Sequence, residues 1–251
     1  MNHTSKMTGY TPGYYGKKRM SAAEWANAYI KKWESDSRSR GEEIPVINNI
    51  CFSRQIGVGA LEIADILSDM INFRVIDREI LEHMAKETNL TEKAIEFYDE
   101  RYQGKMSEFL SMLISEKTFL KSDYARQLAK SVTTLGKSAP TIFVGRGTHL
   151  ILPRKNILAV RFVCSWEFRV DRLTKIMDVS KAEAEVQLNI IDSEQLKFFK
   201  SVFQTDDQSP DAFDLVINRE HLSGATQAAE IVACAFKQKF AKKKTGSTSD
   251  K

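Results

Sequence analysis

The sequence is poor in cysteine and contains no long hydrophobic run. Three cysteines stand far apart among 251 residues, and their spacing supports neither a zinc site nor a disulfide framework. No stretch approaches the roughly 20 apolar residues that a membrane helix requires, and the N-terminus lacks the apolar core of a signal peptide. We therefore expect a cytoplasmic protein with reduced, buried cysteines and no membrane association.

An excess of charge of one sign is also missing. The formal net charge is +4, from 37 basic and 33 acidic residues, and the two signs are mixed except in a lysine-rich C-terminal stretch. We interpret residues 241–251 as a disordered basic tail and expect no binding of the protein to DNA or RNA. The alternative interpretation is that this tail contacts a nucleic acid or a membrane surface.

The apolar content, 42%, is sufficient for one main domain. We interpret residues 1–44, which precede this domain, as an N-terminal extension. Residues 1–20 show no periodicity and are expected to form a disordered leader, whose removal leaves the stability unchanged. Residues 21–44 predict an amphipathic helix followed by a linker. Ser21 opens a capping box, and Trp25 and Trp33 share the apolar face. That face is expected to dock on the main domain or on a second subunit.

The main domain is expected over residues 45–240, where short β-type runs alternate with helical periodicity. This alternation predicts an α/β fold with a mostly parallel sheet. The expected strands cover residues 46–52, 73–76, 141–144, 158–163 and 215–217. Helical spacing predicts a long helical region over residues 105–135 and further helices over residues 180–199 and 223–240.

A glycine pair lies between the first predicted strand and the helix that follows it. Gly57 and Gly59 allow backbone N–H groups to approach an anion, and a helix N-terminus adds a partial positive charge. This arrangement is typical of a phosphate-binding loop. The same spacing also fits a turn that only brings the strand close to the helix, so the glycines alone leave both interpretations open.

Five motifs follow one another along the chain. They read SRQIGVGALEI (53–63), IDREIL (76–81), VGRG (144–147), SWEFRVDR (165–172) and DLVINREHL (214–222). In this order they resemble the cytidylate kinase-like family, over about residues 45–236. The resemblance implies a three-layer α/β/α domain of the P-loop NTPase type. It also implies transfer of the ATP γ-phosphoryl group, with Mg²⁺, to a nucleoside monophosphate such as CMP or dCMP.

The resemblance further implies roles for individual residues. Binding of ATP is implied for Ser53, Arg54, Gly57, Gly59 and Glu62. Binding of the acceptor is implied for Asp77, Gly145, Arg146, Asp192 and Lys197. Catalytic roles are implied for Asp77, Arg146, Arg169 and Arg172. Contacts with the metal are implied for Asp77 and Glu62.

Structural roles remain open for several of these residues. Asp77 also fits a helix N-cap, and Arg146 also fits a salt bridge. Arg169 and Arg172, three residues apart on a predicted helix, also fit surface pairs with acidic neighbours. Glu62 stands where other P-loops place a magnesium-binding hydroxyl, so it either binds the metal or repels the phosphates.

The loop departs from the pattern of active kinases. Ala60 and Leu61 occupy positions where P-loop kinases or the cytidylate kinase-like relatives carry cations, and the run from Ile191 to Phe198 keeps only Asp192 of the family's substrate motif. These losses support an alternative, a catalytically impaired pseudokinase that binds a nucleotide or a protein partner. A homodimer through the N-terminal helix or the 105–135 helix is compatible with either function.

Overall fold

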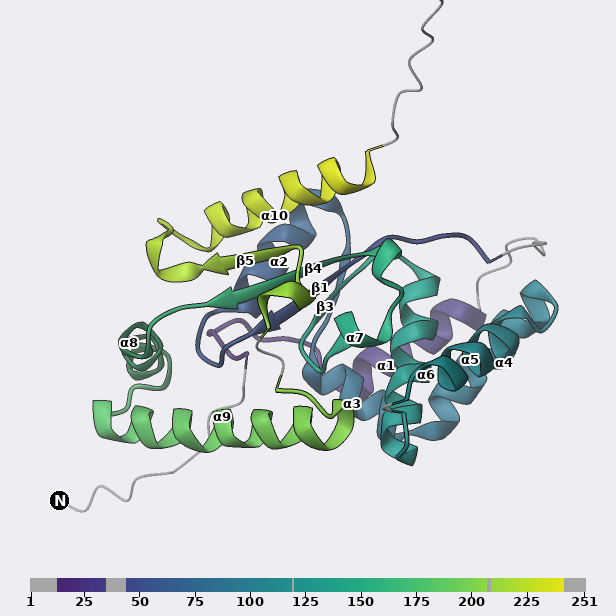
Figure 1. The fold of residues 1–251 in the computed structure, drawn as a ribbon, viewed down its shortest axis with the longest axis horizontal. Coiled ribbons are helices and arrows are strands. Elements are labelled where there is room, and N and C mark those ends of the chain that lie inside the picture. The colour runs from purple at the N-terminus through teal and green to yellow at the C-terminus, as the bar shows by residue number, and fades with distance from the viewer. Residues whose placement is uncertain (1–12, 35–43, 119, 207–208, 242–251) are drawn as a thin grey trace, which may run out of the picture.

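The computed structural model describes residues 13–34, 44–118, 120–206 and 209–241 (Figure 1). A parallel five-stranded sheet in the order β2-β3-β1-β4-β5 lies at its centre. The strands are β1 (Asn49–Arg54), β2 (Arg74–Ile76), β3 (Thr141–Val144), β4 (Ile157–Val163) and β5 (Leu215–Asn218). The predicted parallel sheet is confirmed. The first strand begins later than predicted, because Val46 is 75% exposed and pairs with no neighbouring strand.

Helices cover both faces of the sheet. One face carries α2 (Ala60–Ile71) and α10 (Ala225–Phe240), which lie side by side above the strands in Figure 1. The helices on the side of the opposite face are α3 (Arg78–Lys86), α4 (Thr88–Tyr102), α5 (Lys105–Glu116), α6 (Asp123–Ser138), α7 (Thr148–Ile151) and α9 (Lys181–Phe203). The helix α8 (Trp166–Met177) packs against α9 at one end of the sheet. This is the expected three-layer α/β/α arrangement.

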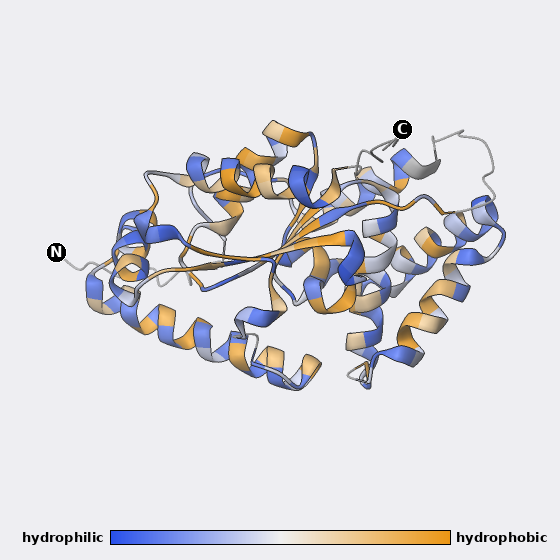
Figure 2. Ribbon diagram, turned by 45° about the horizontal axis from the view of Figure 1, so that its top comes forward, coloured by the Kyte–Doolittle hydropathy of each residue, from blue (hydrophilic) through white to orange (hydrophobic). Residues whose placement is uncertain are grey.

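The central strand shows how one sequence supplies two cores. Ile50 and Phe52 point into the core beneath α2 and α10, while Cys51 between them points into the core beneath the other helices. Side chains alternate between the two faces along a strand, and a parallel sheet covered on both faces needs apolar residues at every position. Figure 2 accordingly shows hydrophobic residues along the strands and hydrophilic residues on the outer sides of the helices.

The predicted long helical region is wrong in its continuity. Two helices, α5 and α6, stand in its place; α5 ends at Glu116, α6 begins at Asp123, and the chain is extended at Lys117. Ser122 then opens α6, because its side-chain oxygen accepts a hydrogen bond from the backbone N–H of Ala125 at 3.1 Å. An internal N-cap starts a new helix even where the apolar spacing continues across it.

The N-terminal helix α1 (Ala22–Glu34) packs on the domain through contacts with α3 and α4. Its predicted capping box is present: the N–H of Ser21 donates to Glu24 at 2.9 Å, and the N–H of Glu24 donates to the Ser21 hydroxyl at 3.3 Å. The α1 residues Ala26 and Tyr29 are buried in this contact. The predicted docking of this helix on the main domain is confirmed, although the side chain of Trp33 lies outside the described residues.

The three cysteines differ in burial. Cys51 and Cys164 are buried, but Cys234 is exposed, so the expectation that all three thiols lie in the core is wrong for that residue.

None of the helices in the described part of the chain combines the length and the hydropathy needed to cross a membrane.

Candidate functional site

The loop between β1 and α2 has the backbone conformation of an anion cradle. Gly57 and Gly59 have φ angles of 86° and 82°, in the left-handed region that glycine adopts without steric cost. Gly59 is the N-cap of α2 and has no side chain to satisfy the free N–H groups of that helix. Backbone N–H groups at the start of a 12-residue helix are therefore directed toward this loop.

The helix α8 lies over the glycine loop. A Cβ on Gly59 would come within 2.9 Å of the Arg172 guanidinium, and a Cβ on Gly57 would come within 3.3 Å of Arg169. Arg172 donates to Glu62 at 2.6 Å. Only about 20 Å³ of open space remains at the mouth of the loop. The structure thus places both arginines against the glycine loop, and Glu62 pairs with one of them.

Arg169 is the more buried of these two arginines. It donates to Asp192 on α9 at 2.7 Å and to the backbone carbonyl of Ile56 in the loop at 3.4 Å. Asp192, expected at the acceptor, therefore connects α9 to α8. The Ser53 hydroxyl accepts a hydrogen bond from Arg161 at 2.9 Å, within the sheet. These contacts fix the positions of the elements around the loop.

Leu61 belongs to the hydrophobic core rather than to the mouth of the loop. It is 6% exposed and packs in the cluster between α2, α10 and the sheet. Gly13 approaches it from the N-terminal side, since a Cβ on Gly13 would lie 3.2 Å from Leu61. The side chain at this position of the loop is therefore apolar, buried and covered by the N-terminal segment.

Residues 13–20, within the expected leader, run along α2 and the start of α3. Arg19 donates to both carboxylate oxygens of Asp65 at 2.5 and 2.7 Å, and the hydroxyl of Tyr15 donates to the same carboxylate. Lys17 lies 3.5 Å from Asp65. Arg19 also lies 3.4 Å from Asp77. One arginine therefore joins the N-terminal segment to α2 and to the turn after β2.

Asp77 caps α3. Its carboxylate accepts from the backbone N–H of Ile80 at 3.1 Å, so the N-cap interpretation fits its geometry. Arg19 lies at the second carboxylate oxygen of Asp77. Glu62 likewise pairs with an arginine, Arg172. In the described part of the chain no three His, Cys, Asp or Glu residues are grouped so as to hold a metal ion. Both carboxylates predicted to contact the metal are therefore engaged by arginines in this structure.

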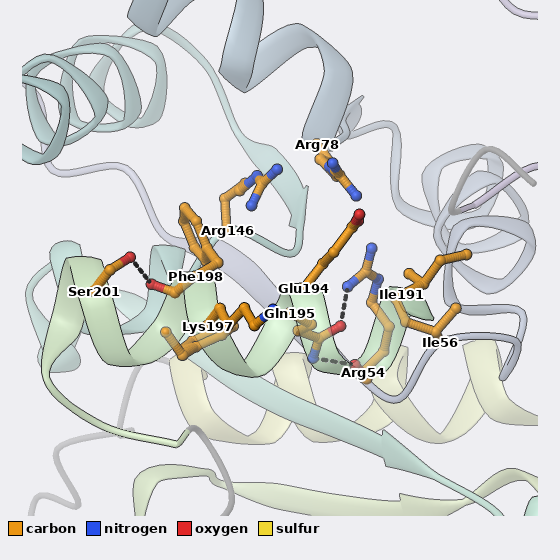
Figure 3. A pocket seen from close by; sticks show the side chains of 11 residues that line it. Arg54, Ile56, Arg78, Arg146, Ile191, Glu194, Gln195, Lys197, Phe198 and Ser201 are labelled. Atoms are coloured by element: carbon orange, nitrogen blue, oxygen red, sulfur yellow. Dashed lines mark hydrogen bonds between the residues drawn. The ribbon is translucent and has the colours of Figure 1, made fainter. Parts of the chain in front are cut away.

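A cavity of about 400 Å³ opens beside the loop, beyond the carboxyl ends of β1, β2 and β3. Arg54 ends β1, Arg78 follows β2 after one residue, and Arg146 follows β3 after one residue; α9 forms the opposite wall with Lys197 and Phe198. Figure 3 shows the three arginines directed into this cavity. We refer to it as the arginine pocket. Gly145, directly before Arg146, donates its N–H to the carbonyl of Phe52 at 2.8 Å and thereby aligns this turn with β1.

Arg146 has the most constrained position in the arginine pocket. Its φ angle is 54°, a left-handed conformation that is uncommon outside glycine and often marks a functional site. Its guanidinium stacks on Phe198 at 4.1 Å and pairs with Glu82 on α3. Burial, together with the positive charges of Arg78 and Arg54, lowers the pKa of Arg146 to about 9. The group keeps its charge at pH 7, and a bound anion would relieve the repulsion.

Some residues that line the arginine pocket were not predicted to belong to the site. Gln195 accepts a hydrogen bond from Arg54 at 3.3 Å and donates to the Arg54 carbonyl at 3.1 Å, so α9 orients that arginine. Arg78 pairs with Glu82 at 2.6 Å, next to Arg146. Its place directly after the predicted strand end and Asp77 was a usable signal. No signal in the sequence predicted the stacking of Phe198 on Arg146, because nothing in the sequence shows which face of α9 meets Arg146.

A known structure shares this fold at low sequence identity. An uncharacterized protein from Eubacterium ventriosum is similar with a TM-score of 0.58 and 15% identity, over 77% of this chain and 99% of its own. A shikimate kinase from Bacteroides thetaiotaomicron is a more distant likeness, with a TM-score of 0.41 and 10% identity over 76% of this chain and 98% of its own.

Sequence comparison identifies the family. No curated protein gives a significant match to the chain. The model of the cytidylate kinase-like family matches residues 49–221, which include the glycine loop, all three arginines of the arginine pocket and both arginines of α8. This match spans more than half of the sequence. The chain therefore belongs to the cytidylate kinase-like family.

Proposed function

We propose that this protein transfers the γ-phosphoryl group of ATP to a nucleoside monophosphate, CMP or dCMP, or to a related phosphorylated acceptor. The arginine pocket is the observation that carries the proposal. Arg54, Arg78 and Arg146 converge there from three different elements, at the edge where ligands bind in open parallel sheets. Guanidinium groups bind phosphate oxygens in a bidentate manner, so this cavity suits an acceptor phosphate.

The glycine loop fits the phosphates of the donor. Gly57 and Gly59 place no side chain over the backbone N–H groups at the start of α2, and such groups bind anions. Arg172 lies directly above them, and a cation at this place can neutralise charge on a transferring group. When bound, ATP would supply the phosphoryl group. Asp77 and Glu62 are the carboxylates that would hold Mg²⁺; each pairs with an arginine here, and we assign no step to the metal.

Access to the donor site requires a displacement of Arg172. Its guanidinium occupies the space over Gly59 and leaves about 20 Å³ at the mouth of the loop. The ion pair between Arg172 and Glu62, with side chains 20% and 30% exposed, is accessible to water and therefore weak enough to exchange for an ATP phosphate. In the proposed reaction, Arg172 leaves Glu62 and contacts the donor phosphates.

Replacement of Arg146 tests the acceptor site. Arg146→Ala should weaken the binding of CMP or another accepted monophosphate by roughly ten- to hundredfold, because a charge-assisted phosphate contact contributes about 1.5 to 3 kcal/mol. Lys200→Ala is the matched control, since Lys200 lies exposed on α9 and does not line the arginine pocket. Binding is measured by calorimetry with CMP, dCMP, UMP and AMP. Equal affinities of both variants for every monophosphate would remove Arg146 from the site.

A pseudokinase is the second candidate, and the burial of Leu61 favours it. The loop contributes no cation of its own, since Ala60 and Leu61 are both buried in the core. Charge supplied only in the transition state is what lowers the barrier of the reaction. An assay of ADP release with ATP, Mg²⁺ and each monophosphate separates the two candidates. Turnover that Arg146→Ala abolishes supports the kinase, whereas nucleotide binding without turnover supports the pseudokinase.

A further inference from the structure

Residues 13–20 cover one side of the glycine loop, and we refer to them as the N-terminal strap. Gly13 and Tyr14 line the mouth of the loop, together with both of its glycines and with Arg172 from α8. The strap also lies on Leu61, because a Cβ on Gly13 would come within 3.2 Å of that side chain. The mouth is thus enclosed from two sides. Its open space, about 20 Å³, holds about one water molecule and leaves no room for a triphosphate.

A buried carboxylate on α2 anchors the strap. Asp65 accepts hydrogen bonds from the Tyr15 hydroxyl and, with both of its oxygens, from Arg19 at 2.5 and 2.7 Å. The ammonium group of Lys17 lies 3.5 Å from the same carboxylate. Three alternate residues of the strap therefore share one acceptor, which is only 8% exposed. Charge-assisted hydrogen bonds in such a shielded place are strong enough to keep the strap against α2 in the free protein.

The strap also engages a carboxylate that would hold Mg²⁺. The Arg19 guanidinium lies 3.4 Å from one oxygen of Asp77, and the two side chains are 24% and 14% exposed. The other oxygen of Asp77 accepts a hydrogen bond from the N–H of Ile80 at 3.1 Å. Mg²⁺ binds through carboxylate oxygens, so the metal and Arg19 compete for the same group. A nucleotide that arrives with its metal therefore meets a strap that occupies both the mouth of the loop and Asp77.

We propose that the N-terminal strap is autoinhibitory: it closes the donor site in the free protein and leaves α2 when ATP and Mg²⁺ bind. This inference rests on the proposed function, because the donor site is the one described there. Only molecules with an open strap accept ATP, so the apparent affinity is reduced by the fraction of open molecules. The coupling is reciprocal, and ATP in turn favours release of the strap.

A disulfide tests whether the strap must leave. A Cβ on Gly13 would lie 3.8 Å from the Cβ of Leu61, which is the usual separation in a disulfide. Gly13→Cys with Leu61→Cys therefore locks the strap in place when oxidised. Both changes are made in the full chain carrying Cys234→Ser, because the thiol of Cys234 is exposed. The reduced form of the same protein is the matched control. The φ angle of Gly13 is 108°, which cysteine adopts only with strain, so mass spectrometry verifies that the bond has formed.

Calorimetry with ATP and Mg²⁺ measures the effect. The oxidised form should bind ATP at least about tenfold more weakly than the reduced form. Deletion of residues 1–20 should have the opposite effect and tighten ATP binding at least about tenfold relative to deletion of residues 1–12, which leaves the strap in place. Equal affinities in either comparison, or weaker ATP binding after the longer deletion, would overturn the proposal.

Two point variants weaken the anchor without removing the strap. Asp65→Asn and Arg19→Gln should each tighten ATP binding severalfold. Their matched controls, Asp69→Asn at an exposed position of α2 and Lys18→Gln at an exposed position of the strap, should have no effect. ATP binding of equal strength in every form refutes the role of the strap and leaves the donor site in place. Absence of ATP binding after deletion of residues 1–20, in a protein that thermal melts show to be folded, refutes the donor site itself and the strap with it.

Discussion

Deletion of residues 1–20 should destabilise this protein, whereas the sequence alone predicts no change. The reason lies at Asp65, whose side chain is only 11% exposed and accepts hydrogen bonds from both Tyr15 and Arg19. Deletion removes these partners and also uncovers Leu61, which Gly13 contacts. Deletion of residues 1–12, which precede the described segment, removes none of these contacts and is the matched control.

The magnitude follows from the contacts at Asp65. A hydrogen bond to a charged group contributes about 1.5 to 3 kcal/mol, and breaking a buried ion pair costs about 3 to 5 kcal/mol. Both figures are upper limits here, because the Arg19 side chain is 24% exposed and the deletion admits water to Asp65. We expect a loss of about 2 kcal/mol in the free energy of unfolding. For a chain of this size that corresponds to a melting temperature lower by about 4 to 8 °C.

Thermal melts and urea titrations of the full chain and of both deletion variants measure this difference. Arg19→Gln should reproduce part of the loss, and Lys18→Gln, an exposed neighbour on the same segment, should reproduce none. The reasoning is refuted if the deletion of residues 1–20 melts within about 1 °C of the deletion of residues 1–12. In that case the contacts of Tyr15 and Arg19 do not stabilise the fold in solution.

Two further outcomes follow from the site. Leu61→Arg should lower the melting temperature by several degrees, because it places a charge in the core, whereas Leu61→Met should cost less than about 1.5 kcal/mol; thermal melts compare them. Arg172→Gln should reduce phosphoryl transfer more than ATP affinity, because it removes a cation and also clears the space over Gly59; kcat and Kd are measured separately.

Local signals in the sequence predicted most of the fold. The predicted capping box at Ser21 forms, and α9 starts within one residue of its predicted start. The predicted strands lie within a few residues of the observed ones. Such features depend on contacts between residues close in the chain, which spacing and residue type reveal. The break between α5 and α6 was not predicted, because the apolar spacing continues across the Ser122 cap.

The candidate site was predictable only in part. That Gly57, Gly59 and Arg146 lie at a sheet edge follows from their positions after strands, because parallel strands end on the same side. The contacts around the site could not be predicted from the sequence. Gln195 on Arg54 and Arg172 over Gly59 join segments more than 100 residues apart, and periodicity carries no information about such pairs.

The sequence by itself determined the alternation of strands and helices, the glycine turn before α2 and the family, because each is written in neighbouring residues. Only the tertiary structure decided that Leu61 turns into the core, that Arg19 joins Asp65 to Asp77, and that α1 packs against α3 and α4. These features depend on how helices pack across the sheet. Packing is a property of complementary surfaces distant in the chain, which local spacing does not specify.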